Sequence, residues 1–399
     1  MTTPAPTVHG HCDPRFATVA SALARQISSG NELGASICVS LNGEPVVDIW
    51  AGHATPAKDK EWEKDTIAPV WSISKTITAL AVLLLIDRGQ ISPDDPVHKY
   101  WPEFDTEDKR GVLVKHFLAH TSGLPSWDPE ISVETLFDIP LSTAKLVAQK
   151  PWWEPGTASG YHLISQGHLL GGLLERVTGK PLPEFVRDEL AVPRDADFHL
   201  GLHDESQWPR IAEMVPPPPM PKEFMQAAAA SRAPGGGGPG IGLRAMFGCR
   251  LDAETCNTAP FRTCGIGSMG GISNARGFNR ILDIVTLGGA AGGKRYLKPE
   301  TVDLIFETQA DGIDLVLGSP LKMGMGFGLV NGSLAWMPEG KVCFWGGYGG
   351  SLAVLDLDRR ITITYAMNRM EMGTLGNSNA EEYVKAVYKV VEGLGQASL

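Results

Sequence analysis

The beginning of the chain shows two different spacings of apolar residues, and each spacing predicts a different element. Over residues 16–27 the apolar positions recur at helical spacing, which predicts a helix. The apolar stretch 34–41 that follows is typical of a strand, and Asn42-Gly43 after it is a strong signal for a tight hairpin turn. The segment 45–50 is therefore predicted to be the returning strand.

The middle of the chain is predicted to be mostly helical. The run 76–86 is largely apolar, which indicates a buried helix, and Asp87-Arg88-Gly89 marks its end. Further helical patterns cover residues 115–120 and 163–177. We therefore expect several helices between the first hairpin and the C-terminal part.

Two runs rich in proline and glycine, 215–221 and 234–240, interrupt this pattern. Neither can hold regular structure along its length, because proline lacks an N–H and glycine is too flexible. The connection they form is either a lid or pocket wall, or a plain surface excursion.

The C-terminal part alternates between helical and strand patterns. A helix is predicted over 273–287 and an amphipathic helix over 380–391. Strands are predicted between them, at 326–330, 341–344, 352–355 and 361–365. Together these elements predict an α+β fold, in which one antiparallel sheet is flanked by helices and interrupted by a mostly helical inserted domain. We expect residues 1–70 and 270–399 to form the sheet domain, and residues 71–269 to form the helical domain.

Composition and charge narrow the possible partners. The 399 residues are 43% hydrophobic and 20% charged, which is ordinary for a globular protein. The net charge is −10 and no long basic run occurs, so neither nucleic acid nor an anionic membrane is expected as a partner. Six cysteines are scattered without a Cys-x-x-Cys pair, so the sequence predicts no metal site and no disulfide framework.

The cellular location is predicted from the N-terminal residues and from the length of the longest apolar stretch. Residues 1–7 lack the cationic and apolar regions of a secretory signal. The longest apolar stretch, within 77–86, is too short to span a bilayer. A cytoplasmic protein is therefore expected.

The candidate chemistry begins at Ser72-Ile73-Ser74-Lys75. Residues three apart on a helix share a face, so Ser72 Oγ and Lys75 Nζ can meet in the first turn. A serine hydroxyl becomes a good nucleophile only when a neighbouring base takes its proton, and a lysine can be that base only when burial keeps it neutral. The same four residues could instead be a simple helix cap, so partners elsewhere in the chain must decide.

Three further segments supply such partners. They are 114–125, with Thr121-Ser122-Gly123; 155–163, in which Tyr161 follows a Pro-Gly-Thr turn; and the glycine-rich 344–351. Their order and spacing resemble the serine β-lactamase and penicillin-binding-protein superfamily, most of all its class C β-lactamase-like esterases, the family VIII carboxylesterases. The resemblance covers roughly residues 15–395.

The resemblance implies a role for each motif residue. Ser72 would be the nucleophile that is acylated, Lys75 its activating partner, and Tyr161 the group that passes a proton to the leaving group. The backbone N–H groups of Tyr348 and Ser72 would form the oxyanion hole. It implies no cofactor and no metal. Whether Lys75 or Tyr161 is the primary base stays open.

The chain departs from the β-lactamase pattern in two places. Trp345-Gly346-Gly347 stands where β-lactamases carry Lys-Thr-Gly, which removes the cation that would hold a β-lactam carboxylate. Leu163 stands where those enzymes carry an asparagine, so it cannot donate to an amide carbonyl. Both departures favour an ester over a β-lactam.

Several aromatic residues near these motifs are candidates for an apolar acyl pocket. Each of them is alternatively an ordinary core residue. The candidates are Trp127, Trp152, Trp153, Phe344 and Tyr348.

Three other patterns are predicted to carry no chemistry. The glycine pattern in 265–270 fits Gly-x-Gly-x-x-Gly, but no clear strand precedes it, so it predicts a tight turn and not a dinucleotide site. No Gly-x-Ser-x-Gly surrounds any serine, which argues against an α/β-hydrolase. His116 and His120 lack a third metal ligand and are interpreted as structural.

The sequence therefore predicts a metal-free serine hydrolase that cleaves a small-molecule carboxylic ester through an acyl-enzyme on Ser72. An acyltransferase to an alcohol acceptor, a weak β-lactamase or amide hydrolase, and a non-enzymatic binding descendant remain as alternatives. The natural substrate and the oligomeric state are left open.

Overall fold

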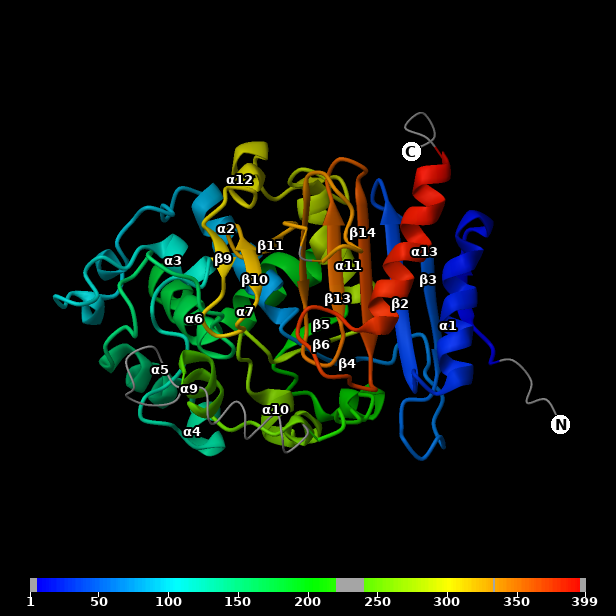
Figure 1. Cartoon of the computed structure of the whole chain (residues 1–399), viewed down its shortest axis with the longest axis horizontal. Helices are drawn as coiled ribbons and strands as arrows, with labels where there is room; N and C mark the ends of the chain where they lie inside the picture. Colours follow the sequence, from blue (N-terminus) through cyan, green and yellow to red (C-terminus); the bar gives the residue numbers. More distant parts are fainter. Residues whose placement is uncertain (1–5, 220–239, 333, 395–399) are drawn as a thin grey trace.

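The largest sheet joins the two ends of the chain (Figure 1). The structure, a computed structural model, describes residues 6–219, 240–332 and 334–394. Within them, nine strands form one antiparallel sheet. Their order across it is β1 (His9–Cys12), β3 (Glu44–Gly52), β2 (Gly34–Leu41), β14 (Ile361–Met367), β13 (Leu352–Asp356), β12 (Val342–Gly346), β11 (Gly328–Leu329), β10 (Pro320–Met323) and β9 (Ala310–Ile313).

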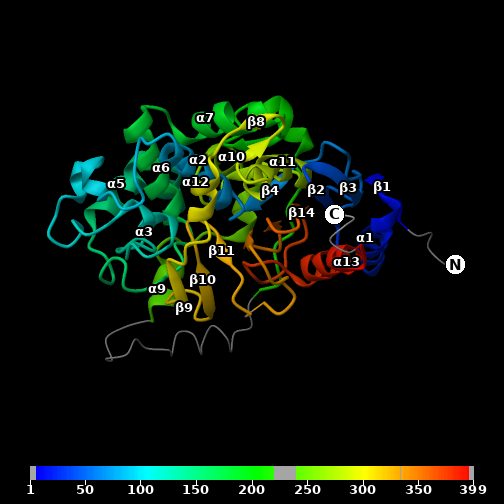
Figure 2. The ribbon, with the colours of Figure 1, turned by 90° about the horizontal axis from the view of Figure 1, so that it is seen from above.

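Helices cover both faces of this sheet. α1 (Ala17–Ser29) and α13 (Ser378–Leu394) pack together over one face, and α11 (Ala275–Thr286) lies against β2, β13 and β14 on the other (Figures 1 and 2). Because β2 lies between these layers, all of its residues are buried. This agrees with the continuous apolar run in its sequence.

The first hairpin forms as the sequence predicts. Asn42 and Gly43 connect β2 to β3 with φ of 53° and 84°. Two positive φ values are what a two-residue turn of this kind requires, and asparagine and glycine tolerate them best.

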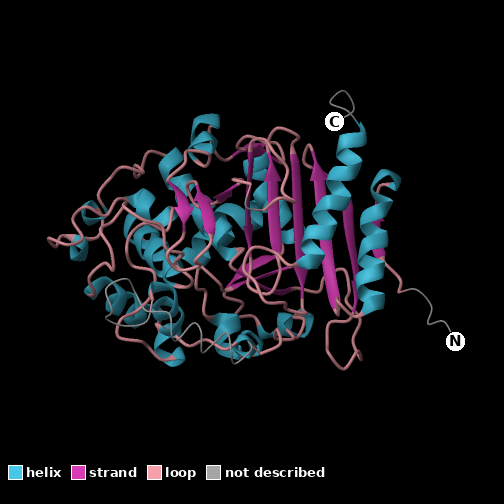
Figure 3. Cartoon of the chain, viewed as in Figure 1, coloured by secondary structure: helices cyan, strands magenta, loops and turns pink. Residues whose placement is uncertain are grey.

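The rest of the described chain is mostly helical and lies beside the sheet (Figure 3). α2 (Ser74–Asp87) runs through its centre and is buried on every side up to Leu85, which explains why its sequence shows no polar face. The other α-helices are α3 (Val114–Leu118), α4 (Val133–Phe137), α5 (Ile139–Ala148), α6 (Ser165–Thr178), α7 (Leu182–Val186), α9 (Ile241–Phe247), α10 (Ala259–Thr263) and α12 (Pro299–Leu304).

Short elements connect these helices. Short 3₁₀- or π-helices lie at Pro14–Phe16, Val97–Lys99, Pro102–Phe104, Arg187–Ala191, Val192–Arg194, Glu205–Arg210 and Ala253–Asn257. A small antiparallel sheet has the order β4 (Ala68–Trp71), β6 (Gly271–Ser273), β5 (Phe198–Leu200), and β7 (Ala290–Ala291) pairs with β8 (Lys294–Arg295). None of the helices in the described ranges is both long and apolar enough to cross a membrane.

Three details differ from the sequence-based expectations. α2 begins at Ser74 and not at Ser72, because Trp71 has a φ of 49° and the chain turns before it becomes helical. α3 ends at Leu118, since His120 has a φ of 61°, which a right-handed helix cannot contain. The strand expected over 326–330 is reduced to Gly328–Leu329.

The proline- and glycine-rich connection is only partly described. Val215 forms an isolated parallel bridge with Arg369. Residues 220–239, which include the end of the first run and most of the second, lie outside the described residues, and the expectation of a lid or pocket wall falls largely on them.

Candidate active site

Ser72 and Lys75 meet where β4 turns into α2. Lys75 Nζ lies 3.1 Å from Ser72 Oγ. Two hydrogen bonds of Ser74 fix this turn: its Oγ donates to the carbonyl of Trp71 and accepts from the N–H of Gly271 in β6. The predicted pair is therefore brought together, although Ser72 precedes the helix instead of opening it.

The ammonium or amine of Lys75 is enclosed by two carbonyl groups. Lys75 Nζ donates to the carbonyls of Leu163 at 2.7 Å and Ser268 at 2.9 Å. Its side chain is only 2% exposed, and it forms no ion pair within the described residues. Burial therefore lowers the pKa of Lys75 well below that of a free lysine.

The positions of these two carbonyls determine the direction in which the lone pair of a neutral Lys75 Nζ can point. The two carbonyls can only accept, so they engage the two hydrogens of a neutral amine. The remaining direction around Nζ faces Ser72 Oγ, and the amine lone pair can lie there. The geometry thus suits Lys75 as the group that takes the serine proton.

Tyr161 lies next to both Lys75 and Ser72. Lys75 Nζ lies 4.9 Å from the centroid of the Tyr161 ring, and Trp345 Nε1 donates to the Tyr161 hydroxyl at 3.3 Å. Burial raises the pKa of Tyr161 above that of a free phenol. Hydrogen bonds of its hydroxyl with Ser72 and Trp345 lower this pKa, and the charge of Asp314 raises it further. Tyr161 is therefore a protonated phenol at neutral pH.

The glycines after Trp345 let the end of β12 approach two neighbouring backbone segments closely. A Cβ at Gly346 would lie 2.6 Å from the backbone of residues 374–376, and a Cβ at Gly347 would lie 2.3 Å from the carbonyl oxygen of Val70. Real Cβ atoms do not approach backbone atoms this closely, so both positions need glycine. The end of β12 is thereby held against β4, next to Ser72.

Two N–H groups remain without acceptors beside the serine. Across the described ranges, the N–H groups of Ser72 and Tyr348 donate no backbone or side-chain hydrogen bond. The Tyr348 ring packs edge-on against Trp71, the residue before Ser72, at 5.4 Å between centroids. Free donors near a nucleophile are what an oxyanion hole requires.

The other predicted aromatic residues lie in different surroundings. Trp153 packs edge-on against His162, and Phe344 is tilted against Trp345. Trp127 donates to the carbonyl of Ser142 and packs against His168, and the Arg244 guanidinium lies 3.9 Å from the Trp152 ring. Trp153 and Phe344 thus adjoin the Tyr161 surroundings, whereas the contacts of Trp127 and Trp152 are with the helical region.

The structure adds three residues to which the motifs gave no role in the site, and one of them, His120, was interpreted from the sequence as structural. The His120 ring packs edge-on against Tyr161 at 4.8 Å, and burial, His162 and Lys75 together lower its pKa well below that of a free imidazole. Asp314 accepts from the N–H of Tyr161. Ser268, which lies inside the glycine pattern interpreted as a turn, supplies one of the carbonyls around Lys75.

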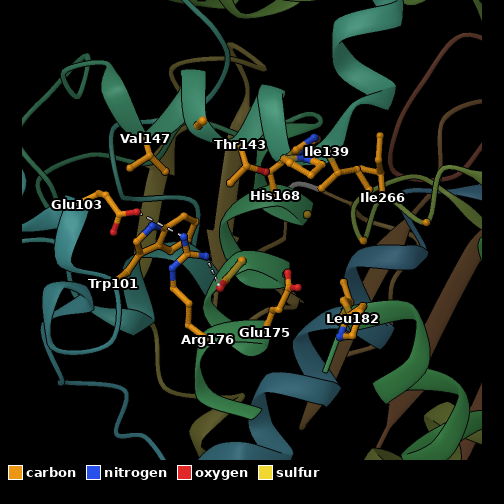
Figure 4. Close-up of a pocket in the computed structure, with 18 of the residues that line it drawn as sticks. Trp101, Glu103, Ile139, Thr143, Val147, His168, Glu175, Arg176, Leu182 and Ile266 are labelled. Carbon is orange, nitrogen blue, oxygen red and sulfur yellow. Dashed lines mark hydrogen bonds and ion pairs between the residues drawn. The ribbon is translucent and has the colours of Figure 1, made fainter. Parts of the chain in front are cut away.

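Figure 4 shows a cavity in the helical region. It has a volume of about 1020 Å³ beside α5 and α6, and Ser72, Lys75 and Tyr161 are not among its lining residues. Arg176 lies over the Trp101 ring at one end, and Leu182 and Ile266 form the other (Figure 4).

Known proteins match the chain along most of its length. The beta-lactamase family model matches residues 19–388. Esterase/beta-lactamase LipL of Mycobacterium tuberculosis is 32% identical over 369 residues, which cover 91% of this chain and 83% of that protein. The crystal structure of a family VIII carboxylesterase superposes with a TM-score of 0.87 at 30% identity, over 96% of this chain and 100% of the other. A penicillin-binding-protein homologue from Caulobacter crescentus superposes with a TM-score of 0.85 at 28% identity, also over 96% and 100%.

Proposed function

The chain belongs to the beta-lactamase family, and from this premise we propose that it is a serine carboxylesterase that works through an acyl-enzyme on Ser72. The predicted α+β fold and the predicted family are confirmed. The observation that carries the proposal is the enclosed Lys75, whose Nζ lies 3.1 Å from Ser72 Oγ.

In the first step Ser72 Oγ attacks the ester carbonyl while its proton moves to Lys75 Nζ. The negative charge that forms on the carbonyl oxygen is held by the free N–H groups of Ser72 and Tyr348. When the bond to the alcohol breaks, Tyr161 donates its phenolic proton to the departing oxygen and regains one from protonated Lys75. The products of this step are the free alcohol and an acyl ester on Ser72.

In the second step water attacks the acyl carbonyl and the same groups act in reverse. Lys75 and Tyr161 take one proton from the water, and Ser72 Oγ regains a proton as the acid leaves. No charge is left on the enzyme, because each proton given up in one step is regained in the next.

The surroundings of Tyr161 favour an ester over a β-lactam. Trp345 presents an indole N–H and an apolar ring where a β-lactamase presents a cation, and the side chain of Leu163 is apolar. Trp345 therefore offers no positive charge to the carboxylate of a β-lactam, and Leu163 has no donor for its amide carbonyl. We expect hydrolysis of short acyl esters to exceed turnover of nitrocefin by a wide margin.

The proposal includes a cytoplasmic location and a small-molecule ester as the partner. All six cysteines are free, and five of them are buried. Unpaired thiols suit a reducing compartment. Fractionation of cells that produce the chain would test the location.

The experiment that tests the function is covalent labelling combined with turnover. A fluorophosphonate should add once to the wild-type protein, at Ser72, and stop hydrolysis of p-nitrophenyl butyrate. Ser72→Ala should lose both reactions while it stays folded, and Ser28→Ala, at an exposed helical serine, should keep both. Hydrolysis by folded Ser72→Ala at the wild-type rate would contradict the proposal.

A further inference from the structure

Three consecutive N–H groups around Tyr161 each have a specific acceptor. The N–H of Gly160 donates to the carbonyl of His120 at 3.0 Å, and the N–H of His162 donates to His120 Nδ1 at 3.1 Å. Between them, the N–H of Tyr161 donates to Asp314 Oδ1 at 2.9 Å. The backbone that carries the phenol is therefore fixed on both sides.

Asp314 is an unusual acceptor, because it is a fully buried carboxylate. It is 0% exposed, and it forms no ion pair within the described ranges. Burying a carboxylate without a cation is costly unless several hydrogen bonds offset the loss of water. The hydrogen bonds of Asp314 must therefore offset this cost.

Four donors surround this carboxylate. Besides the N–H of Tyr161, Oδ1 accepts from the N–H groups of Val316 and Leu317 at 2.9 Å each, and Oδ2 accepts from Ser159 Oγ at 2.6 Å. Two of the donors belong to its own turn and two belong to the segment of Tyr161. Asp314 therefore joins two parts of the chain that are 153 residues apart.

The part of the chain that supplies Asp314 also contacts the catalytic cluster. Asp314 lies in the connection between β9 and β10, and the N–H of the next residue, Leu315, donates to the carbonyl of Ser159 at 2.8 Å. Leu321 and Met323 of β10 pack with Tyr161 and Trp345. The β9–β10 hairpin is thus attached to the Tyr161 segment by backbone bonds, by apolar packing and by one carboxylate.

We propose that Asp314 is a positioning residue for ester hydrolysis, which holds the phenol of Tyr161 at the distance from Lys75 and Ser72 that proton transfer requires. This inference rests on the proposed function. Burial is the main cause that raises the pKa of Tyr161, and the charge of Asp314 adds to it.

The alternative is that Asp314 only closes its own turn through Val316 and Leu317. Both roles predict a loss of stability when Asp314 is removed, so stability does not separate them. They differ in kcat, because only the positioning role places the reacting proton.

The test compares kcat and KM for p-nitrophenyl butyrate in three variants. Asp314→Ala should lower kcat about 100-fold and leave KM nearly unchanged, because a displacement of about 1 Å at a reacting group has an effect of this size. Asp314→Asn should recover most of kcat, since its amide oxygen can still accept from the N–H of Tyr161. Asp283→Ala is the matched control: Asp283 is a buried carboxylate under the sheet that accepts from Ser40 and Thr362. It should lose stability without losing kcat.

Each outcome has one meaning. Inactive wild-type protein would reject the proposed function, and not the role of Asp314 within it. With an active wild type, an Asp314→Ala variant that is folded and has the wild-type kcat overturns the inference, and so does an Asp314→Asn variant as impaired as Asp314→Ala.

If Asp314→Ala does not fold, Ser159→Ala replaces it. This change removes only the donor to Oδ2 and should lower kcat severalfold at constant KM. A wild-type kcat in that variant overturns the inference.

Discussion

Trp345 donates its indole N–H to the hydroxyl of Tyr161, so the residue that replaces the β-lactamase lysine is in direct contact with the predicted proton carrier. Because an indole N–H can only donate, it leaves the phenolic hydrogen of Tyr161 free to point elsewhere. The departure from the β-lactamase pattern therefore has two effects: it removes a cation and it orients Tyr161.

Trp345→Phe should lower kcat/KM for p-nitrophenyl butyrate about 2- to 10-fold, the equivalent of one hydrogen bond. The apolar wall is kept, so KM should change less than kcat. Trp62→Phe is the control, because the buried indole N–H of Trp62 has no partner in the described structure. Equal effects of the two changes would show that the hydrogen bond to Tyr161 is unimportant.

The pH profile of kcat/KM should report the lowered pKa of Lys75. The base acts only as a neutral amine, so activity should be lost as pH falls through the pKa of Lys75. The midpoint of that loss should lie well below 10.5, the ordinary value, because burial lowers the pKa. Tyr161 should cause no loss up to pH ~10, since its pKa is raised above the usual phenol value. Two esters with different alcohols should give the same midpoint, and a midpoint near that of free lysine would refute the assignment.

Glu32 should make the protein less stable as pH rises. Its Oε1 accepts from Tyr365, Tyr383 and Asn379. Its Oε2 has no hydrogen-bond partner in the described part of the chain. Burial raises the pKa of Glu32 to about 8, and the charge of Glu371 adds to this rise. Because the folded pKa exceeds the unfolded value of 4.5, the free energy of unfolding should fall between pH 4.5 and about 8.

Glu32→Gln stays neutral, so its free energy of unfolding should lack this fall and should exceed that of the wild type at pH 9. Urea denaturation at pH 6 and pH 9 measures the difference. Glu205→Gln, at an exposed position, should keep the wild-type dependence. Parallel behaviour of Glu32→Gln and the wild type would contradict a buried, protonated Glu32.

Gly346→Ala should damage both stability and activity. Its Cβ would overlap the backbone of residues 374–376, so that loop or β12 must move. A loss of about 1–3 kcal/mol in the free energy of unfolding is expected from such overpacking. Gly111→Ala is the matched control, because an added Cβ there meets nothing within 4 Å. If Gly346→Ala crystallised with an unmoved loop and full activity, the close approach at this position would not matter.

The closeness of Ser72, Lys75 and Tyr161 could be predicted because each of them belongs to a short motif. Ser72 and Lys75 are three residues apart, and Tyr161 follows a recognisable turn. What the sequence could not supply was the backbone at Trp71, whose positive φ delays the helix by two residues. An aromatic side chain gives no local signal for that conformation.

The other residues of the site could not be predicted from the spacing of residues along the chain. Ser268 contributes through its carbonyl, which every residue possesses, so its identity carries no information about Lys75. Asp314 reaches Tyr161 across 153 residues, and only the folded chain brings the two together. The roles of the pocket aromatics and the domain division at residues 70 and 270 stay predictions.

The two carbonyls around Lys75 come from residues 88 and 193 positions further along the chain. During synthesis, the segment with Ser72 and Lys75 leaves the ribosome long before Ser268 is made. Until then we expect Lys75 to be hydrated and charged and Ser72 to lack a neighbouring base, because the burial that lowers the pKa of Lys75 is absent. The newly made chain therefore cannot attack esters prematurely, and recovery of esterase activity during refolding reports the completion of the native topology more directly than the return of helix content.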